Sequence, residues 1–452
     1  MNFRQISAAE RTATMFPLQA YAFMPSPWPA EDEEINAQRM KFFESAVSLV
    51  AEEDGQALAA VAAFRMRQNV RGRLHDMAGV ASVSSHPSAR RRGLVRELMR
   101  RLLRQMRDEG CAVSVLYPFR AGFYARFGFV GIPRYRTAAF APEGLDHLLR
   151  AELPGEVTWL PMSEAFDEWD GLQRHLLTRR HGFAVFDELR AAEFRDDKYW
   201  VAVARSGGEV VGAVRYRIKS YGGDLIADHL LCANSIGRAL LLQFFARHVD
   251  QVSRVVVKIS TDEVPELWGT DIQVVTEGKV DRPSHGGPMV RVLDMEALNG
   301  AAVGPGAITV EIPDDELIGG VWRLESVDGA LAVTKGTTPT NGTTPTNGTT
   351  PTNGTTPTNG TTPTNGTTPT NGTTLTEGTT PTDGTTPTDG TTLMKGTTPA
   401  ATLSVGGFSA LLYGVLDPVE VVTRGLGEIP PEAVPTLAAM FPREMPYLVA
   451  DF

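Results

Sequence analysis

The sequence predicts an α+β protein built from three consecutive parts, residues 1–150, 151–288 and 289–452. Three observations support this fold class. At 452 residues the chain is too long for one ordinary hydrophobic core, so two or three domains are expected. Helix-like and strand-like patterns alternate through the first two parts. A six-residue repeat then interrupts the third part, with strand-like sequence on both sides of it.

The composition excludes several classes of protein. The chain is 42% hydrophobic and carries a formal net charge of −10, which argues against a protein that coats nucleic acid or anionic lipid. Its two cysteines, Cys111 and Cys232, lie far apart and form no metal-binding or disulfide pattern, so no metal is expected. The opening MNFRQISAAERTATMF lacks the apolar core of a secretory signal, and no apolar run is long enough to span a bilayer. We therefore expect a soluble cytoplasmic protein.

The first part has its most informative motif where a strand is followed by a helix. AGVASVSSHP is suited to a strand that Pro87 closes, and ARRRG comes directly after it. Beyond the arginines, apolar residues at helical spacing predict a helix with arginines on its other face. The apolar stripe consists of Leu94, Val95, Leu98, Leu102, Leu103 and Met106. Residues 90–93 therefore lie at a strand-to-helix junction.

Such a junction is suited to binding a phosphate group. A helix N-terminus presents unpaired N–H groups and a partial positive charge. Gly93 lets a ligand approach the backbone, and the arginines from Arg90 to Arg92 supply charge. The alternative is a solvated basic turn, which is what most basic runs form. That turn would put positive charge at the unfavourable end of the helix dipole, at a cost of about 0.3–1 kcal/mol per residue that a bound anion would reverse.

The next segment supplies a second motif. CAVSVLYP, residues 111–118, is typical of a buried strand, and AGFYARFGFVGI follows it. Together, the R-x-x-G-x-V pattern (Arg90, Gly93, Val95) and the F-Y-x-R-F-G-F pattern (residues 123–129) resemble the coenzyme A site of a GNAT acetyltransferase. This resemblance spans roughly residues 1 to 140.

Over the whole chain, the sequence resembles the enhanced intracellular survival family of aminoglycoside-type GNAT N-acetyltransferases. The resemblance rests on VSSHPSARRRGLVREL, GFYARFGF, the second part and the terminal ADF. It implies a catalytic GNAT domain, a degenerate GNAT-like domain and a sterol-carrier-protein-like α+β domain for the three parts. It also implies a homohexamer that uses acetyl-CoA to acetylate primary amines of cationic small molecules, such as aminoglycosides or polyamines, by direct attack on the thioester.

The resemblance places acetyl-CoA between the strand before the arginines and the helix after them. Most contacts would run from backbone N–H groups to the pyrophosphate. The cofactor-binding positions that it implies are Val83, Ser84, Ser85, Arg90, Arg91, Arg92, Gly93, Leu94, Val95, Arg96, Phe119 and Arg120.

The resemblance also implies the two groups that would move protons. Tyr124 matches the family's general acid, and a phenol with a pKa near 10 is a suitable donor to a departing thiolate. The alternative is that Tyr124 only packs in a core beside neighbouring phenylalanines. The family's general base is the chain's terminal carboxylate, here that of Phe452. Asp451 beside it would attract cationic amines and raise the pKa of that carboxylate.

Phe23 and Trp28 are candidates for an aromatic wall around the acceptor, next to the acidic stretch AEDEE at residues 30–34. A solvated acidic loop is the alternative interpretation of that stretch. His75 and His86 are expected to be structural, because a lone histidine beside a strand is more often structural than catalytic.

The second part contains a two-strand hairpin, YWVAVARSGGEVVGAVRYRI, around Gly207 and Gly208. Its nearest match to the phosphate motif is ANSIGRALLLQFF, which has Asn234 where the motif needs Gln or Arg and lacks the aromatic partner motif. In the third part, residues 336–398 form an insertion in which GTTPTN-like units recur. These units have almost no apolar side chain to bury, so the insertion is expected to be disordered. The third part would deliver Phe452, with lipid carriage as the alternative role.

Two classes of function stay open at this point. The first is an acetyl-CoA-dependent amine N-acetyltransferase, with a protein-lysine acetyltransferase as its variant. The second is a non-catalytic acyl-CoA sensor or lipid carrier with an inert GNAT domain. Turnover that depends on Tyr124 and on the terminal carboxylate would separate them. Neither nucleic acid nor a membrane is an expected partner.

Overall fold

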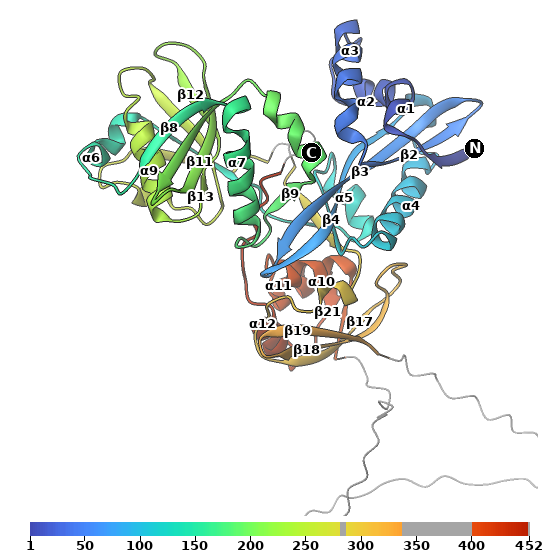
Figure 1. Ribbon diagram of the computed structural model, residues 1–452. Coiled ribbons are helices and arrows are strands. Elements are labelled where there is room, and N and C mark those ends of the chain that lie inside the picture. Colours follow the sequence, from blue (N-terminus) through green and yellow to red (C-terminus); the bar gives the residue numbers. More distant parts are fainter. Residues whose placement is uncertain (281–285, 337–399, 451–452) are drawn as a thin grey trace, which may run out of the picture. The chain divides into compact units, whose positions relative to one another are not determined.

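The computed structural model describes residues 1–280, 286–336 and 400–450. The predicted insertion at 336–398, apart from Gly336, and the predicted site residues Asp451 and Phe452 lie outside the described residues. Within the described ranges, strands form two eight-stranded sheets and one five-stranded sheet, with helices packed on them (Figure 1). The predicted α+β class, with two consecutive mixed sheets and a third sheet region, is confirmed. No helix in these ranges is long and apolar enough to cross a membrane.

The first sheet has the strand order β1-β2-β3-β4-β5-β16-β6, and β9 pairs with β3. Its strands are β1 (Asn2–Gln5), β2 (Val47–Glu53), β3 (Gln56–Val70), β4 (Arg73–Ser85), β5 (Val113–Leu116), β6 (Val130–Gly131), β9 (Ala184–Phe186) and β16 (Met289–Val292). Its helices are α1 (Ala8–Thr14), α2 (Phe16–Phe23), α3 (Ala30–Arg39), α4 (Leu94–Asp108) and α5 (Ala121–Tyr124). The β2–β3 hairpin turns at Asp54 and Gly55, whose φ values of 52° and 78° suit a two-residue turn.

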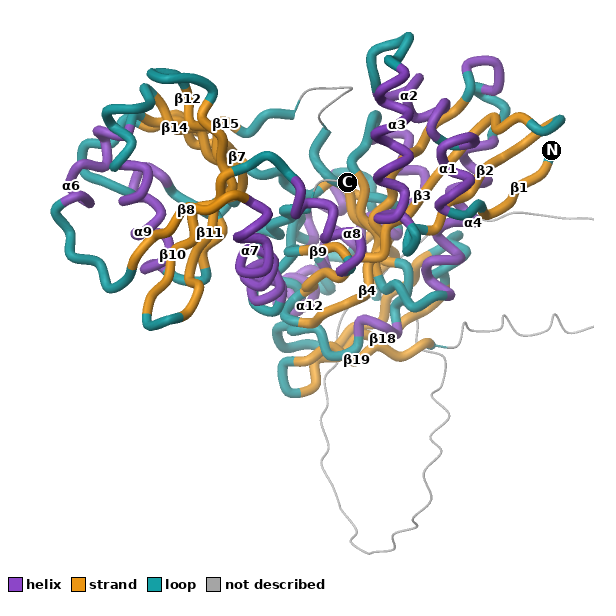
Figure 2. The backbone as a smooth tube through the Cα atoms, turned by 45° about the horizontal axis from the view of Figure 1, so that its top comes forward, coloured by secondary structure: helices purple, strands orange, loops and turns teal. Residues whose placement is uncertain are grey.

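Successive residues of β2 and β3 bury opposite faces of this sheet, because side chains alternate along a strand. Val50 and Ala62 pack with Met15, which joins α1 to α2. Leu49 and Val61 face the other way and pack with α4. The buried residues of α4 are Leu94, Leu98, Met99, Leu102, Leu103 and Met106. The predicted apolar stripe is therefore confirmed except at Val95, which is half-buried, and Met99 joins it. Figure 2 shows α1 to α3 alongside the first strands.

The second sheet has the order β15-β7-β14-β12-β11-β10-β8, and β13 pairs with β11. Its strands are β7 (Arg136–Phe140), β8 (Glu156–Pro161), β10 (Trp200–Ser206), β11 (Glu209–Ile218), β12 (Asp224–His229), β13 (Leu231–Cys232), β14 (Arg254–Ile259) and β15 (Val274–Glu277). The helices in this part of the chain are α6 (Asp146–Leu149), α7 (Met162–Leu177), α8 (Glu188–Ala191) and α9 (Ser235–Ala246). The predicted hairpin around Gly207 and Gly208 is formed by β10 and β11.

Membership of the first two sheets does not follow the order of the chain. β7 precedes residue 150, yet it lies between β15 and β14 in the second sheet. β16 follows residue 288, yet it lies between β5 and β6, where Val290 is paired with both Val115 and Val130. The domain boundaries at residues 150 and 288 stay predictions. Strand β7 precedes the first boundary but belongs to the second sheet, and strand β16 follows the second boundary but belongs to the first sheet.

The third sheet has the order β19-β18-β17-β20-β21. Its strands are β17 (Ala307–Ile312), β18 (Gly320–Val327), β19 (Ala330–Lys335), β20 (Ala401–Leu403) and β21 (Gly427–Glu428), and its helices are α10 (Val405–Leu412), α11 (Pro418–Thr423) and α12 (Val434–Met440). Helix α10 packs on the first sheet, where Ser409 Oγ accepts a 3.1 Å hydrogen bond from Val292 N. A Cβ added at Gly128 would lie 2.7 Å from Val405 Cβ, so the two segments touch closely.

His75 makes the stability of this fold sensitive to acid. It is 5% exposed on β4, and burial, aided by the charge of Arg73, lowers its pKa to about 4. In the unfolded chain the imidazole titrates near 6.5, so between pH 6.5 and 4 the unfolded chain binds a proton that the folded chain does not. The free energy of unfolding is therefore expected to fall as pH falls through this window, by about 3 kcal/mol from His75 alone.

The measurement is urea denaturation at pH 7.5, 6 and 5 for the wild type and for His75→Gln. His181 and His248 also have lowered pKa values and are present in both proteins, so the difference in pH slope isolates His75. Equal slopes would contradict the assignment.

Candidate functional site

The C-terminal end of β4 is open along one edge. β4 pairs with β5 only from Met77 to Val80, whereas its pairing with β3 continues to Ser85. At Ser82, whose φ is 59°, two residues of β4 oppose one of β3, which is a β-bulge. In the part of the chain that the structure describes, no strand covers the second edge of residues 83–85. Their backbone groups can therefore pair with an extended ligand.

The N-terminus of α4 lies a few residues further along the chain. Gly93 is the N-cap residue, and no side chain accepts the first N–H groups of this 15-residue helix. The backbone before it takes the left-handed conformation at Arg91 (φ 65°) and at Gly93 (φ 82°). A Cβ added at Gly93 would meet no atom within 4 Å, so the space in front of the helix is open. Free N–H groups at the positive end of a helix dipole form a site for an anion.

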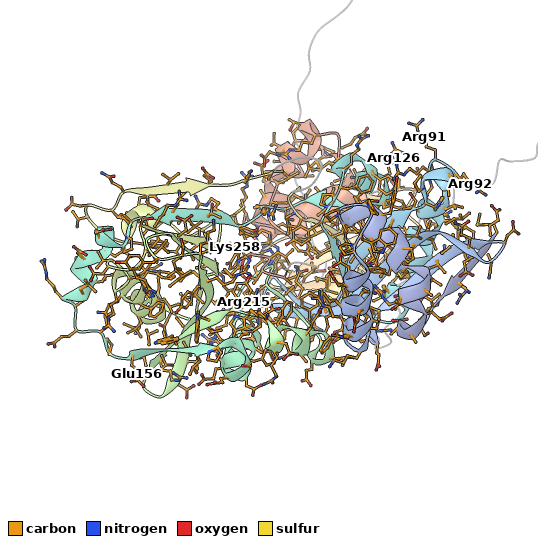
Figure 3. The ribbon with its side chains drawn as sticks, turned by 90° about the horizontal axis from the view of Figure 1, so that it is seen from above. Arg91, Arg92, Arg126, Glu156, Arg215 and Lys258 are labelled. Atoms are coloured by element: carbon orange, nitrogen blue, oxygen red, sulfur yellow. The ribbon has the colours of Figure 1, made fainter. Side chains whose placement is uncertain are left out.

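The arginines around this helix divide into paired and unpaired groups. Arg92 pairs with Glu53 at 2.9 Å, and Arg101 pairs with Glu97 at 2.7 Å. Within the described residues, Arg90, Arg91 and Arg96 have no ion-pair partner, and all three line the same cleft. Figure 3 labels Arg91 and Arg92, which precede α4, and Arg126, which lies in the 3-10 helix Ala125–Phe127. The unpaired arginines leave positive charge available to a ligand.

The open edge of β4 and the start of α4 face one large cleft of about 2710 Å³, including its solvent-filled mouth. The structure brings together nearly all of the predicted cofactor-binding residues there. Those that line the cleft are Val83, Ser84, Ser85, Arg90, Arg91, Gly93, Leu94, Val95, Arg96, Phe119 and Arg120. Arg92 does not line it, because its side chain turns toward Glu53 on the β2 strand.

The two aromatic residues predicted for the acceptor line different hollows. Phe23 ends α2, is 61% exposed and lines the large cleft. Trp28 is half-buried against Phe16, with ring centroids 6.2 Å apart, and lines a neighbouring hollow. The hollow and the cleft have Tyr21 and Ser85 in common. The two rings therefore do not form one continuous wall.

Tyr124 is buried, with 3% of its surface exposed, at the end of α5. Its ring packs edge-on against Phe123 at 5.1 Å and Phe119 at 5.6 Å between centroids. Burial raises the pKa of the Tyr124 phenol, so it holds its proton at neutral pH. Tyr124 itself does not line the cleft, whereas Phe119 and Phe123 on either side of it do. Both the core-packing alternative and the acid role are compatible with this position.

Asp451 and Phe452 lie outside the described residues, but hydrogen bonds fix the position of the segment before them. Tyr117, which follows β5, donates a 3.1 Å hydrogen bond to the carbonyl of Ala450. Tyr447 is buried, and its hydroxyl shares a 2.7 Å hydrogen bond with Nδ1 of His229. Its backbone N–H donates to the carbonyl of His181 at 2.9 Å. The chain therefore passes from the second sheet to the end of β5 just before its last two residues.

A second hollow lies beside this segment, and sequence reasoning missed it; its volume is about 640 Å³ when the space open to solvent is included. Its lining includes Trp169, Asp170, Phe194, Arg215, Asp228, His229, Val449 and Ala450. Burial alone would raise the pKa of Asp228, but His229, Arg215 and Lys258 outweigh it and hold that pKa well below its ordinary range. Lys258 Nζ lies 2.7 Å from Asp228 Oδ1. Asp170 pairs with Arg174 at 2.6 Å. These groups come from β11, β12, β14 and α7, so no local motif could have marked them.

Helix α9 connects the parallel strands β12 and β14 of the second sheet, as α4 connects β4 and β5 of the first. Unlike the N-terminus of α4, that of α9 is capped by a side chain. Asn234 Oδ1 accepts the N–H of Gly237 at 3.0 Å and so caps the helix itself. A Cβ added at Gly237 would lie 1.9 Å from the carbonyl oxygen of Val211, so the helix rests directly on β11. A hollow lined by Asn234, Ser235 and Arg238 lies at this helix start, but Asp262 and Glu263 also line it, and their negative charge disfavours a phosphate. This supports the interpretation of a degenerate copy.

Sequence reasoning also missed the far wall of the large cleft. Arg291 of β16 and residues 314–317, between β17 and β18, line it opposite α4. These residues come from a chain segment distant from the motif and have no recognisable pattern. Within the described ranges, no three His, Cys, Asp or Glu residues form a group that could hold a metal ion.

Comparisons with known proteins agree with this geometry. Residues 2–131 match the model of the family described as "Acetyltransferase (GNAT) domain". An uncharacterized N-acetyltransferase of Streptomyces coelicolor is 29% identical over 329 residues, which cover 67% of this chain and 78% of the relative. The expectation of a GNAT domain in the first part is thereby confirmed.

Two crystal structures share the fold of the described residues. A GCN5-related N-acetyltransferase from Kribbella flavida has a TM-score of 0.71 and 20% identity, with coverage of 100% of this chain and 98% of its own. Eis1 from Mycobacterium abscessus has a TM-score of 0.70 and 16% identity, with full coverage of both chains. At these identities the likeness establishes the fold: two tandem GNAT-like sheet domains and a third sheet region.

Proposed function

Because this chain is a GNAT-family N-acetyltransferase, we propose that it transfers the acetyl group of acetyl-CoA to a primary amine and binds the donor between β4 and α4. One observation carries the proposal: the open edge of β4 and the uncapped N-terminus of α4 face the same cleft. A strand edge suits the amides of the pantetheine arm, and a helix N-terminus suits the pyrophosphate.

In this proposal each group of cleft residues has a distinct role. Residues 83–85 pair with the pantetheine amides, and the first N–H groups of α4 hold the pyrophosphate. Arg91 and Arg96, which have no ion-pair partner within the described ranges, neutralise the phosphate charge. Phe119 and Arg120 close the cleft beyond the end of β5.

Transfer requires that one proton be removed and one delivered. The amine nitrogen loses a proton as it bonds to the acetyl carbon, and the electron pair of the breaking carbon–sulfur bond passes to sulfur. We assign delivery of a proton to that sulfur to Tyr124, because burial keeps its phenol protonated. We assign proton removal to the carboxylate of Phe452, as the family resemblance implies. The position of Ala450 beside Tyr117 supports this assignment.

The acceptor is proposed to be a primary amine on a cationic small molecule, such as a polyamine or an aminoglycoside. The net charge of −10 favours encounter with a cation. The rings of Trp169 and Phe194 in the second hollow offer aromatic surface to a cation beside Ala450. For the third sheet region we propose the sterol-carrier-like fold that the resemblance implies, with the role of carrying Phe452.

The test is thiol release from acetyl-CoA with spermidine, spermine, kanamycin and a lysine-containing peptide as acceptors. We expect turnover with at least one small amine. Arg91→Ala should raise the KM for acetyl-CoA by about 10-fold, the effect of one lost charge-assisted phosphate contact. Arg92→Ala, which breaks only the pair with Glu53, should raise it by a smaller factor.

The outcomes separate the parts of the proposal. Equal effects of the two substitutions would contradict the placement of the pyrophosphate. Activity retained after residues are added beyond Phe452 would remove the carboxylate from the mechanism but leave the transferase. Binding of acetyl-CoA without turnover on any amine would contradict the proposed activity.

A further inference from the structure

We propose that Arg291 is a positioning residue for acetyl transfer: it fixes the end of the helical segment that carries Tyr124 to a loop of the third sheet region. This inference rests on the proposed function, because it assumes that Tyr124 donates the proton. Arg291 belongs to β16, which lies between β5 and β6, and its side chain reaches the wall of the large cleft.

The contacts of Arg291 join three parts of the chain. The residue is 4% exposed, so its guanidinium charge has little access to water. One terminal nitrogen donates to the carbonyl of Phe127. The other donates to both carboxylate oxygens of Asp315, at 3.0 and 2.8 Å. Because one planar guanidinium binds both groups, the carbonyl of Phe127 is linked to Asp315 of the third sheet region.

Phe127 is where the helical segment of Tyr124 ends. Helix α5 continues into the 3-10 helix Ala125–Phe127, which Gly128 closes with a φ of 78°. The last carbonyls of a helix lack partners within it, and a cation there is favourable. Arg291 provides the cation and satisfies one of these carbonyls. Val405 of α10 also packs closely against Gly128, so this end of the segment is held by two separate contacts.

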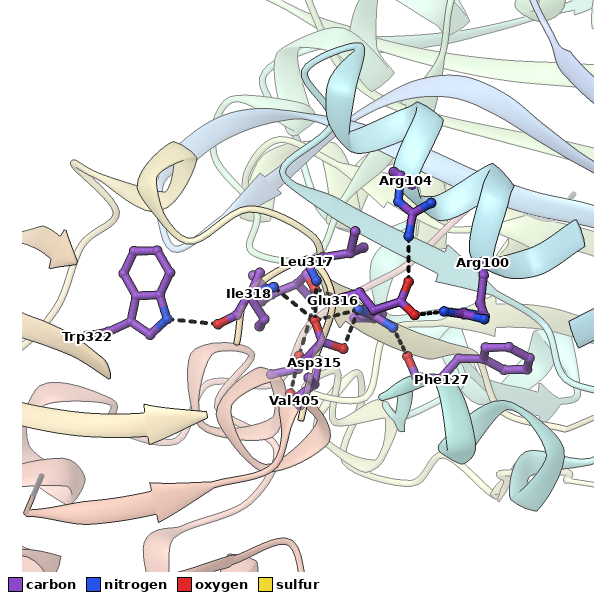
Figure 4. Close-up of polar contacts among 12 residues, drawn as sticks. Arg100, Arg104, Phe127, Asp315, Glu316, Leu317, Ile318, Trp322 and Val405 are labelled. Atoms are coloured by element: carbon purple, nitrogen blue, oxygen red, sulfur yellow. Dashed lines mark hydrogen bonds and ion pairs between the residues drawn. The ribbon is translucent and has the colours of Figure 1, made fainter. Parts of the chain in front are cut away.

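The partner loop, residues 313–319, is itself firmly held. Asp315 Oδ1 accepts the N–H groups of Leu317 and Ile318, both at 2.9 Å. Trp322 Nε1 donates to the carbonyl of Ile318 at 2.8 Å. Glu316 pairs with Arg104 at 2.7 Å and with Arg100, both on α4. Figure 4 shows this loop between α4 and Phe127.

These contacts fix the loop at residues 313–319, which in turn holds two parts of the cleft wall in position. On one side it holds α4, whose N-terminus would bind the pyrophosphate, and on the other side it holds the segment of the proton donor. Misplacement of a reacting group by about 1 Å can cost on the order of 100-fold in rate. The loop at residues 313–319 thus sets the distance between the acetyl-CoA cleft at α4 and the phenol of Tyr124, although the loop itself contains no catalytic group.

A purely structural ion pair would be the simpler explanation, and Arg71 offers the matched control. Arg71 is 3% exposed and also ties the first sheet to the C-terminal region, through the carbonyls of Leu412 and Pro442. It makes no contact with the segment of Tyr124 or with the large cleft. Replacement of either arginine should lower the melting temperature, but only replacement of Arg291 should change the position of the Tyr124 phenol.

The experiment is a double-mutant cycle on the full chain with the best amine of the panel. Arg291→Lys, Tyr124→Phe and the double variant are compared with the wild type, and Arg71→Lys is the control. We expect Arg291→Lys to lower kcat by about 10-fold and to leave kcat almost unchanged in the Tyr124→Phe background, because a residue that acts through the phenol has no effect without it. Arg71→Lys should lower the melting temperature, and any change in kcat that it causes should be by the same factor with and without the Tyr124 hydroxyl.

Several results would overturn the inference. One is a fall in kcat of Arg291→Lys by the same factor with and without the Tyr124 hydroxyl. Another is an effect of Arg71→Lys on kcat that depends on the Tyr124 hydroxyl as strongly as the effect of Arg291→Lys does. If Arg291→Lys does not fold, Asp315→Asn is measured in the same cycle, since it weakens the pair without removing the contact to Phe127. Absence of turnover by the wild type would instead overturn the proposed function, and this inference with it.

Discussion

Replacement of Tyr124 by phenylalanine is expected to lower kcat by roughly 10²- to 10⁴-fold, the range over which positioned general acids contribute. The KM for acetyl-CoA should change little, because the ring stays in place and the cleft does not include Tyr124. The phenylalanine keeps the edge-on packing against Phe119 and Phe123, so the melting temperature should stay close to that of the wild type. Thiol release and thermal unfolding measure both properties.

The pH dependence gives an independent check of the same group. An acid must be protonated to act, and burial raises the pKa of Tyr124, so its deprotonation moves to higher pH than that of a free phenol. The wild-type kcat should therefore show no loss near pH 10 that depends on Tyr124.

Tyr216→Phe is the matched control, because Tyr216 is also a buried tyrosine but lies in the second sheet, away from the cleft. If the kcat of Tyr124→Phe is within two-fold of the kcat of Tyr216→Phe, Tyr124 is not the general acid and only packs in the core.

Gly237→Ala is expected to lower the free energy of unfolding by about 3 kcal/mol or more. The new methyl group would lie 1.9 Å from the carbonyl oxygen of Val211, which belongs to the backbone of β11 and cannot rotate away. Helix α9 would have to move off the sheet, and overpacking of this kind costs about 1–3 kcal/mol even where side chains can adjust. The midpoint of thermal unfolding reports the change.

Gly171→Ala is the control for the substitution itself. Gly171 lies within α7, is exposed, and has no atom within 4 Å of the position of an added Cβ. Alanine there should stabilise the helix by up to about 1 kcal/mol, since glycine is the weaker helix former. Opposite signs at the two positions are therefore expected. A neutral Gly237→Ala would mean that α9 does not rest on β11 as closely as described.

The parts of the site that could be predicted from sequence are those where one short segment carries the chemistry. The strand, Gly93 and the helix after it follow each other within residues 83–96, so their pattern alone indicates an anion site, and the structure places them on one cleft. The same holds for the apolar stripe of α4 and for the hairpin around Gly207 and Gly208.

The parts that could not be predicted depend on contacts between distant segments. Nothing in the local sequence shows that Arg92 would turn to Glu53 while Arg91 stays on the cleft. Arg291 of β16 binds Asp315 of the loop between β17 and β18, and neither residue lies in a recognisable motif. Trp28 and Phe23 are close in sequence, but the end of α2 separates the surfaces that they line.

The position of β16 has a consequence for the order in which the protein forms on the ribosome. The first sheet lacks a strand between β5 and β6 until residues 289–292 have been synthesised, long after β1 to β6 have emerged. Domains tend to fold from the N-terminus as they emerge, and pairing over such a distance along the chain is slow. The cleft can therefore become complete only after residues 289–317, which supply β16 and part of the cleft wall, have emerged. For the same reason, residues 1–150 cannot be excised as an intact domain: the excised piece would leave facing edges of β5 and β6 unpaired and open to aggregation.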